Sequence, residues 1–173
     1  PYAYSDQPSK DIHNIPEWIS IWLKEKFIKK DKQENKKLPK KFYIDRSDSI
    51  SNVAKLRTIV NEEEVKDFLE KKGFSSIRLS DLHFADQVQL FNQADFVVGL
   101  HGAAFANMAF CKSKTKVLEF KNTTDDKVIE NLARTNNLNF TSISCEPVAF
   151  NFTNQLGHIK VPIEVLEEKI NNL

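Results

Sequence analysis

The stretch FVVGLHGAAFANMAF, residues 96–110, decides the fold. It runs from an apolar strand, through two glycines that flank Leu100 and His101, into a helix rich in alanine. A short, continuous apolar strand is typical of a buried parallel sheet. Gly102 permits a tight turn and lets an anion approach the backbone, and a helix that starts near Ala103 would direct free N–H groups at that anion. The stretch therefore predicts a strand–turn–helix unit with an anion site at its turn.

Strands and helices alternate along the chain on both sides of this stretch. Strands are expected at 42–44, 74–79, 96–98, 116–120 and 139–143, and helices at 62–72, 86–94, 102–110, 125–135 and 162–170. This order predicts an α/β fold, a three-layer Rossmann-like domain around a mostly parallel sheet with at least four parallel strands. Ligands of such sheets bind at the carboxyl ends of the strands, near the point where the strand order switches.

Residues 1–40 are expected to form an N-terminal helix and a basic linker that pack on the domain formed by residues 41–173. Asn14 is a candidate cap, Pro16 favours a first turn, and apolar residues up to Phe27 fall partly at helical spacing. The segment 29–41, KKDKQENKKLPKK, fits either a solvated linker or a surface for a membrane or nucleic acid. We favour the linker because acidic residues interrupt the basic run and no aromatic residue lies within it.

Composition and charge are those of an ordinary globular protein. The 173 residues carry a formal net charge of +1, which calls for neither a nucleic acid nor an acidic partner. Cys111 and Cys145 form no CxxC motif, so neither a zinc site nor a disulfide framework is indicated. No apolar run reaches the length of a membrane span and no signal peptide opens the chain, which begins at Pro1 and is expected to be a piece of a longer protein. Asn-x-Ser/Thr sequons, which matter only in the secretory pathway, occur at Asn122, Asn139 and Asn151.

Three basic side chains near strand ends are candidates for binding a phosphate group. His101 can donate a hydrogen bond from its turn, more strongly if protonated, and its place beside glycine at a βα turn favours function over a structural role. Arg46 follows the first strand, and Arg57 lies in the polar segment after it, where a guanidinium suits bidentate phosphate recognition. The alternative for the arginines, equally supported for Arg57, is a surface ion pair with Asp45, Asp48 or Glu62.

Glu119 ends an apolar strand, where a carboxylate can bind ribose hydroxyls or act as a general base, although no second carboxylate is spaced against it. The strand-end loops contain no DxD cluster to hold a divalent metal, and Asp125-Asp126 fits the start of a helix. Asn61 fits a helix cap. We therefore expect no metal, and a diphosphate neutralised by arginine, histidine and a helix terminus.

The order of these residues resembles glycosyltransferase family 61. The signals lie within residues 42–120 and comprise two arginines, an Asn-Glu pair that opens a helix, a glutamine within a helix, a Gly-x-His-Gly-Ala turn with a later asparagine, and a strand that ends in glutamate. In this chain they are Arg46, Arg57, Asn61-Glu62, Gln87, Gly99, His101-Gly102-Ala103, Asn107 and Glu119. Asp45 departs from the pattern, because the family usually has serine there, and its carboxylate could pair with Arg46 and weaken the grip of that arginine on phosphate.

The resemblance implies the carboxy-terminal, nucleotide-sugar-binding half of an inverting GT-B-type enzyme. Its donor diphosphate would be bound by Arg46, Arg57, His101, Gly102 and Ala103, with Asn107 and Glu119 as candidate ribose or sugar ligands. The nucleotide sugar is a substrate, so neither a cofactor nor a metal is expected, and the catalytic base is unassigned. The acceptor would be a hydroxyl group of a glycan or protein, and a missing N-terminal domain of the same enzyme would bind it, so the fragment alone could be inactive.

Location and catalytic status stay open at the level of sequence. The family includes bacterial capsular-polysaccharide enzymes, which would place the protein in the cytoplasm or at the periphery of a membrane. It also includes plant xylosyltransferases and animal O-linked N-acetylglucosamine transferases, which would place the protein in the lumen of the secretory pathway. The alternative function is a non-catalytic nucleotide- or anion-binding module with a scaffolding or regulatory role.

Overall fold

The computed structural model describes residues 15–28, 37–47, 57–123, 127–149 and 157–173. Several expected features lie outside these residues. They are the Asn14 cap, residues 29–36 of the basic segment, Asp48, the helix start at Asp125-Asp126 and the sequon at Asn151. Of the other two sequons, Asn122 is 8% exposed and Asn139 is exposed, so only Asn139 of this pair is accessible on the folded chain.

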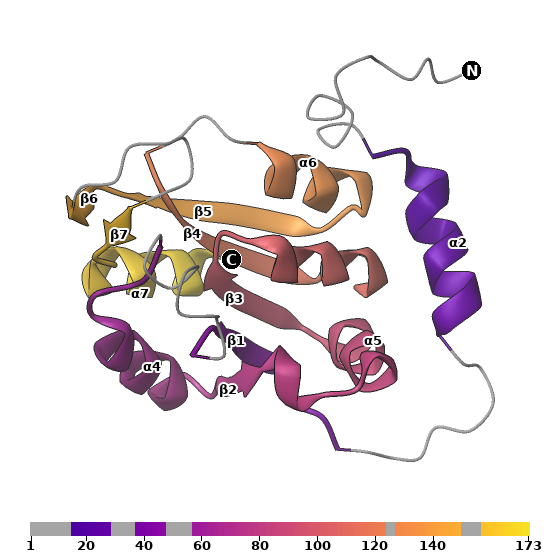
Figure 1. Cartoon of the computed structure of the whole chain (residues 1–173), viewed down its shortest axis with the longest axis horizontal. Coiled ribbons are helices and arrows are strands. Elements are labelled where there is room, and N and C mark those ends of the chain that lie inside the picture. Colours follow the sequence, from indigo (N-terminus) through magenta and orange to yellow (C-terminus); the bar gives the residue numbers. More distant parts are fainter. Residues whose placement is uncertain (1–14, 29–36, 48–56, 124–126, 150–156) are drawn as a thin grey trace.

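Five strands form the central sheet (Figure 1). In chain order they are β1 (Lys41–Asp45), β2 (Ser75–Arg78), β3 (Phe96–Leu100), β4 (Lys116–Asn122) and β5 (Asn139–Cys145). Their spatial order is β2-β1-β3-β4-β5, and each neighbouring pair is parallel. The chain goes from β1 to β2 on one side and then returns to β3 on the other side, so the strand order switches between β1 and β3. The predicted parallel sheet of at least four strands is confirmed.

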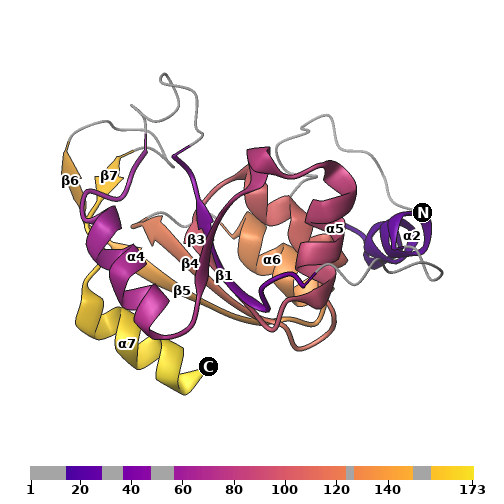
Figure 2. The ribbon, with the colours of Figure 1, turned by 90° about the horizontal axis from the view of Figure 1, so that it is seen from below.

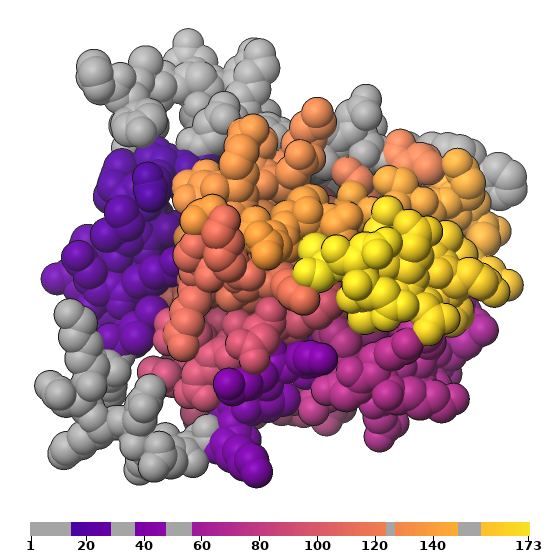
Figure 3. All heavy atoms as spheres, turned by 180° about the vertical axis from the view of Figure 1, so that it is seen from behind, coloured from indigo at the N-terminus to yellow at the C-terminus, as the bar shows by residue number. Residues whose placement is uncertain are grey.

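Helices cover both faces of the sheet (Figure 2). One face carries α4 (Glu62–Lys71) and α7 (Ile163–Asn172), and the other carries α5 (Phe84–Gln93), the 3₁₀ helix η3 (Ala103–Phe110) and α6 (Val128–Thr135). Figure 3 shows α7 beside α4 on its face, where Lys72 Nζ lies 2.6 Å from Glu167 Oε1. The predicted three-layer α/β architecture is therefore confirmed.

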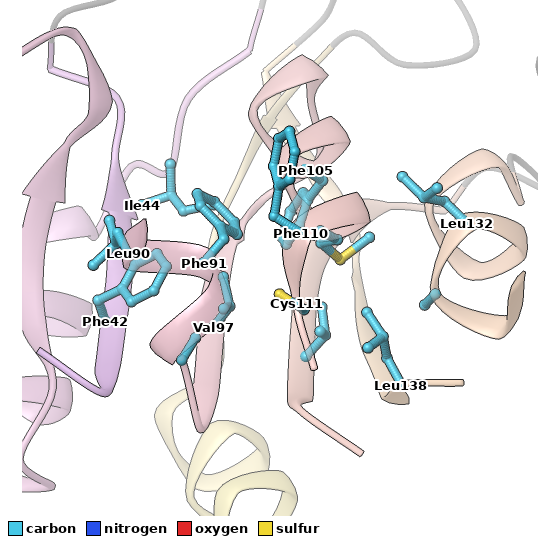
Figure 4. Close-up of a cluster of buried hydrophobic side chains, with 14 of the residues drawn as sticks. Phe42, Ile44, Leu90, Phe91, Val97, Phe105, Phe110, Cys111, Leu132 and Leu138 are labelled. Atoms are coloured by element: carbon cyan, nitrogen blue, oxygen red, sulfur yellow. The ribbon is translucent and has the colours of Figure 1, made fainter. Parts of the chain in front are cut away.

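Two apolar clusters hold the layers together, one on each face of the sheet. In β1, Phe42 and Ile44 enter the cluster beneath α5 and η3, while Tyr43 enters the cluster beneath α4 and α7. Figure 4 shows the first cluster, with Phe105 of η3 among its labelled side chains. A Cβ atom at Gly99 would lie 3.2 Å from Ile44 Cβ and 3.3 Å from Phe105 Cζ, so glycine is what allows η3 to pack this closely on β3.

The N-terminal helix α2 (Glu17–Phe27) packs outside α5 and η3 (Figure 1). Leu23 and the flanking Ile15 and Ile28 contact the first apolar cluster, and the ring of Phe27 lies edge-on to Phe84, with centroids 5.2 Å apart. The expected helix and its packing are thus present, while the division of the chain at residue 40 stays a prediction. In the part of the chain that the structure describes, no helix combines the length and apolar character needed to cross a membrane.

Several local features differ from expectation. The structure adds a small antiparallel sheet of β6 (Pro147–Ala149) and β7 (His158–Ile159), whose strands are too short to show an alternating pattern. The strand expected at 74–79 ends at Arg78, because the short 3₁₀ helix η2 (Leu79–Asp81) begins at the next residue. Asn61 occupies the N-cap position of α4 but makes no side-chain capping bond. Its amide instead bonds both the N–H and the carbonyl of Val161 and so ties α4 to the segment before α7.

Candidate functional site

The carboxyl ends of β1 and β3 meet at the switch in strand order. Arg46 follows β1 directly and His101 follows β3 directly, and the two strands pair with Ile44 opposite Gly99. The Nη1 atom of Arg46 lies 3.4 Å from the backbone carbonyl oxygen of His101 and donates to it. Arg46 and His101 therefore share one edge of the sheet, as predicted, at the position where ligands of doubly wound sheets bind.

Gly102 lies against two guanidinium groups. A Cβ atom placed on Gly102 would be 3.5 Å from Arg46 Nη1 and 3.5 Å from Arg57 Nη2. The backbone of Gly102 is extended, with φ 163° and ψ 174°, so the absence of a side chain provides space here and relieves no strain. Two positive groups that converge on a glycine turn form a surface suited to a doubly charged anion.

The carboxylate of Asp45 is held by groups other than Arg46. Its Oδ2 lies 3.0 Å from Lys66 Nζ, and its Oδ1 accepts a hydrogen bond of 2.7 Å from the Ser47 N–H. Burial acts to raise the pKa of Asp45, but the bonds from Ser47 and Lys66 outweigh burial, so the pKa lies below its ordinary value. The departure from serine at this position therefore leaves Arg46 directed at the His101 turn.

Helix α4 contributes a second polar contact beside the arginines. The Tyr43 hydroxyl donates to Glu62 Oε1 at 2.7 Å, and Lys66 Nζ lies 4.0 Å from the same oxygen. Burial of the Tyr43 ring, followed by the charge of Glu62, raises the pKa of the phenol well above its ordinary value. Glu62 is thereby engaged by Tyr43 and Lys66, so the first turn of α4 is fixed to β1 near Arg46.

His101 and Glu119 form a buried pair. The Nδ1 atom of His101 lies 2.5 Å from Glu119 Oε1, and the two residues are 7% and 1% exposed. The backbone N–H of His101 donates to the Phe120 carbonyl at 2.7 Å, which continues the β3–β4 ladder past the end of β3. The sequence predicted Glu119 at a strand end, as a candidate ribose or sugar ligand. In the structure β4 continues to Asn122, and Glu119 lies inside the fold against the imidazole.

Asn107 and Gln87 connect η3 to α5. Asn107 Nδ2 donates to Gln87 Oε1 at 3.3 Å, and Gln87 Nε2 donates to the carbonyls of Leu79 and Leu82 at 2.9 and 3.2 Å. The helix expected after the turn is a 3₁₀ helix that begins at Ala103, with Phe105 N–H donating to the Gly102 carbonyl. Asn107 thus helps to hold η3 in place, and its part as a sugar ligand stays a prediction.

Two hollows lie near this edge of the sheet and differ in charge. A pocket of about 150 Å³ is lined by both arginines. Its full lining is Tyr43, Arg46, Ser47, Arg57, Thr58, Ile59, Glu62 and Leu100. A hollow of about 430 Å³ at the start of α7 is lined by Glu64, Glu146 and Glu164 against a single lysine, Lys160. Because an anion is repelled by the acidic lining, the arginine pocket is the one of these two hollows whose charge suits an anion.

Metal-binding geometry is not seen in the described part of the chain, where no three or more His, Cys, Asp or Glu side chains are grouped to hold an ion. Binding of an anion by the arginines and the Gly102 turn stays a prediction.

A family model described as Glycosyltransferase 61 matches residues 3–118 and so includes Arg46, Arg57 and the His101 turn. The chain belongs to the glycosyltransferase 61 family. It is similar to the EGF domain-specific O-linked N-acetylglucosamine transferase of Mus musculus, with 27% identity over 89 residues, which cover 49% of this chain and 17% of that protein. The rat protein of the same name, from Rattus norvegicus, is 29% identical over 83 residues, which cover 45% and 16%. The matched segments thus cover about a sixth of the length of these curated relatives.

Within this glycosyltransferase 61 chain, many of the residues that carry the resemblance contact one another. Gln87 binds Asn107, His101 binds Glu119, and Arg46 binds the carbonyl of His101. The sequence did not lead us to expect that Lys66 holds Asp45 and Glu62 beside the arginines. The spacing could have indicated it, because Lys66 stands four residues after Glu62 and so lies on the same face of α4.

Proposed function

We propose that this chain is the donor-binding domain of an inverting glycosyltransferase. In this proposal the diphosphate of a nucleotide sugar binds at the Gly102 turn. Arg46, Arg57 and His101 neutralise its charge, and the backbone N–H groups at Gly102 and Ala103 add further donors. The observation that carries the proposal is the convergence of both guanidinium groups on Gly102.

The chemistry of sugar transfer supports this assignment. When the bond from the sugar to the diphosphate breaks, negative charge develops on the departing phosphate oxygens. Preorganised cationic donors at that place stabilise the charge more in the transition state than in the ground state. Two guanidinium groups and an imidazole supply what a divalent metal supplies in other enzymes, so we propose transfer without a metal.

The acceptor and the rest of the enzyme are also part of the proposal. A second Rossmann-like domain of the same protein would bind the acceptor hydroxyl of a glycan or protein, as in a GT-B arrangement. The curated relatives are named as O-linked N-acetylglucosamine transferases. We therefore place UDP-linked N-acetylglucosamine first among the donors to test.

The test is a thermal-shift and calorimetric screen of the domain against UDP, GDP, CMP, ADP and inorganic pyrophosphate. At ligand concentrations about 100 times Kd, binding stabilises the fold by about 2.7 kcal/mol. For a chain of this size that gain corresponds to a rise in Tm of roughly 5–10 °C. Each ligand is measured both in EDTA and with added Mg²⁺, and equal shifts are expected.

The outcomes separate the parts of the proposal. Flat melting curves with every ligand at millimolar concentration would overturn the donor site. A shift that requires Mg²⁺ would overturn metal-independent binding and keep the site. Ligand binding by the domain, combined with no sugar transfer or donor hydrolysis by the full-length protein, would instead favour a non-catalytic binding module.

A further inference from the structure

The buried carboxylate of Glu119 holds one nitrogen of the His101 ring. Glu119 of β4 stands opposite Gly99 of β3. Gly99 precedes His101 by two residues in the chain. The Oε1 atom of Glu119 lies 2.5 Å from Nδ1 of the imidazole, and the side chain of Glu119 is 2% exposed. In an imidazole ring, Nδ1 and Nε2 point in divergent directions, so the nitrogen that Glu119 holds differs from the one that faces the opposite side of the ring.

We infer that Glu119 is a positioning residue for His101 and not a ligand of the sugar. A carboxylate at Nδ1 selects the ring form that carries its proton on Nδ1 and fixes the orientation of the ring. Only the imidazolium donates from both nitrogens at once, to Glu119 and to a phosphate oxygen. The inference rests on the proposed function for its ligand, but the geometry of the pair exists without one.

The charges around His101 agree with this role. Glu119 of β4 approaches the ring, Arg46 after β1 approaches the His101 carbonyl, and Arg57 approaches the adjacent Gly102. The side chain of Glu119 is 2% exposed, so a direct sugar contact would require the carboxylate to move out of the fold.

Two measurements test the inference, and the first needs no ligand. Nitrogen-15 NMR of the histidine ring in the free protein identifies which nitrogen carries the proton, with His101→Asn used to assign the signal. We expect Nδ1 of His101 to be protonated in the wild type and this preference to be reduced in Glu119→Gln, which keeps the size of the side chain and removes its charge. A neutral ring with its proton on Nε2 in the wild type would overturn the inference.

The second measurement is a double-mutant cycle on affinity for pyrophosphate and UDP, with Glu119→Gln, His101→Asn and both together. Glu119→Gln is expected to weaken binding about tenfold in the wild-type background and to have little effect when His101 is already replaced. Glu119→Asp serves as the conservative variant and should retain part of the affinity.

Each result has a defined meaning. Wild-type affinity in Glu119→Gln would overturn the positioning role. An equal loss in both backgrounds would make Glu119 a direct ligand and would also overturn it. If the wild type binds neither probe, the proposed function fails, whereas the NMR signal of His101 in the free protein still decides the positioning role.

Discussion

Replacing Gly102 with alanine should remove ligand affinity while leaving the fold intact. The new methyl group would lie 3.5 Å from Arg46 Nη1 and 3.5 Å from Arg57 Nη2, which is ordinary contact distance and requires no movement of either arginine. The extended backbone at Gly102 accepts alanine without strain. The change in unfolding free energy should therefore stay within about 1 kcal/mol, with a small gain from the less flexible unfolded chain.

The same methyl group competes with a phosphate for the space between the guanidinium groups. A phosphate oxygen accepts from a guanidinium N–H at about 2.8 Å, closer than a carbon can approach. The methyl group should displace at least one charge-assisted hydrogen bond, worth about 1.5–3 kcal/mol, and so weaken pyrophosphate or UDP binding roughly 10- to 150-fold. Calorimetric titration measures the affinity, and urea unfolding measures the stability of the same variant.

Gly73→Ala is the matched control. Gly73 follows α4 with a φ of +82°, and a Cβ atom added there would have no atom within 4 Å, so alanine brings strain without a new contact. It should cost about 1 kcal/mol of stability and leave affinity unchanged. The two glycines are thus expected to show opposite behaviour. Wild-type affinity in Gly102→Ala, with a wild type that binds, would refute the placement of the anion between the arginines.

Arg46→Ala should weaken diphosphate binding at least as much as loss of His101, and Arg46→Lys should restore it only in part, because an ammonium lacks the fork of a guanidinium; titration calorimetry decides this. Lys66→Met should release Asp45 towards Arg46 and weaken binding several-fold, with affinity restored by adding Asp45→Ser; no loss in Lys66→Met would contradict the proposed pairing. The pKa of Asp45 lies below 3.8, so the ionised carboxylate stabilises the fold above that pH, and this contribution is lost as the pH falls further. In urea unfolding, the stabilities of wild type and Asp45→Asn should therefore differ at neutral pH and converge in strong acid. Burial raises the pKa of Cys111 to about 12 and that of Cys145 to about 11, so both thiols should resist iodoacetamide in mildly alkaline buffer until the protein is unfolded, as mass spectrometry can show.

The layers of the fold were predictable because their signals are local. Apolar runs such as Phe96-Val97-Val98 and the acidic start and basic end of the helix at 62–71 report burial and helix direction without knowledge of partners. The alternation of strands and helices then leaves few topologies, and the strand ends fall on one edge. The 3₁₀ form of η3 was not predictable from composition, since alanine-rich segments ordinarily favour an α-helix.

Side-chain pairings within the site were harder to predict from the sequence, because they join residues that are distant in the chain. His101 and Glu119 are separated by 18 positions, and Gln87 and Asn107 by 20. The sequence placed Glu119 near the end of an apolar strand, but the end of that strand and the group that the carboxylate contacts depend on pairing with neighbouring strands. Here the register sets Glu119 opposite Gly99, two residues before His101 in the chain.

The arrangement separates the residues that build the turn from those that supply its charge. The frame consists of β3, η3 and β4, and it is held by buried contacts such as Phe105 against Gly99 and His101 with Glu119. The positive charge comes largely from Arg46 and Arg57, which follow β1 and reach the turn from the other side of the switch in strand order. Substitutions in the frame should therefore lower Tm and affinity together, because a displaced turn loses both packing and ligand geometry. Substitutions of the arginines should lower affinity with little change in Tm, since neither guanidinium is needed to fill the core.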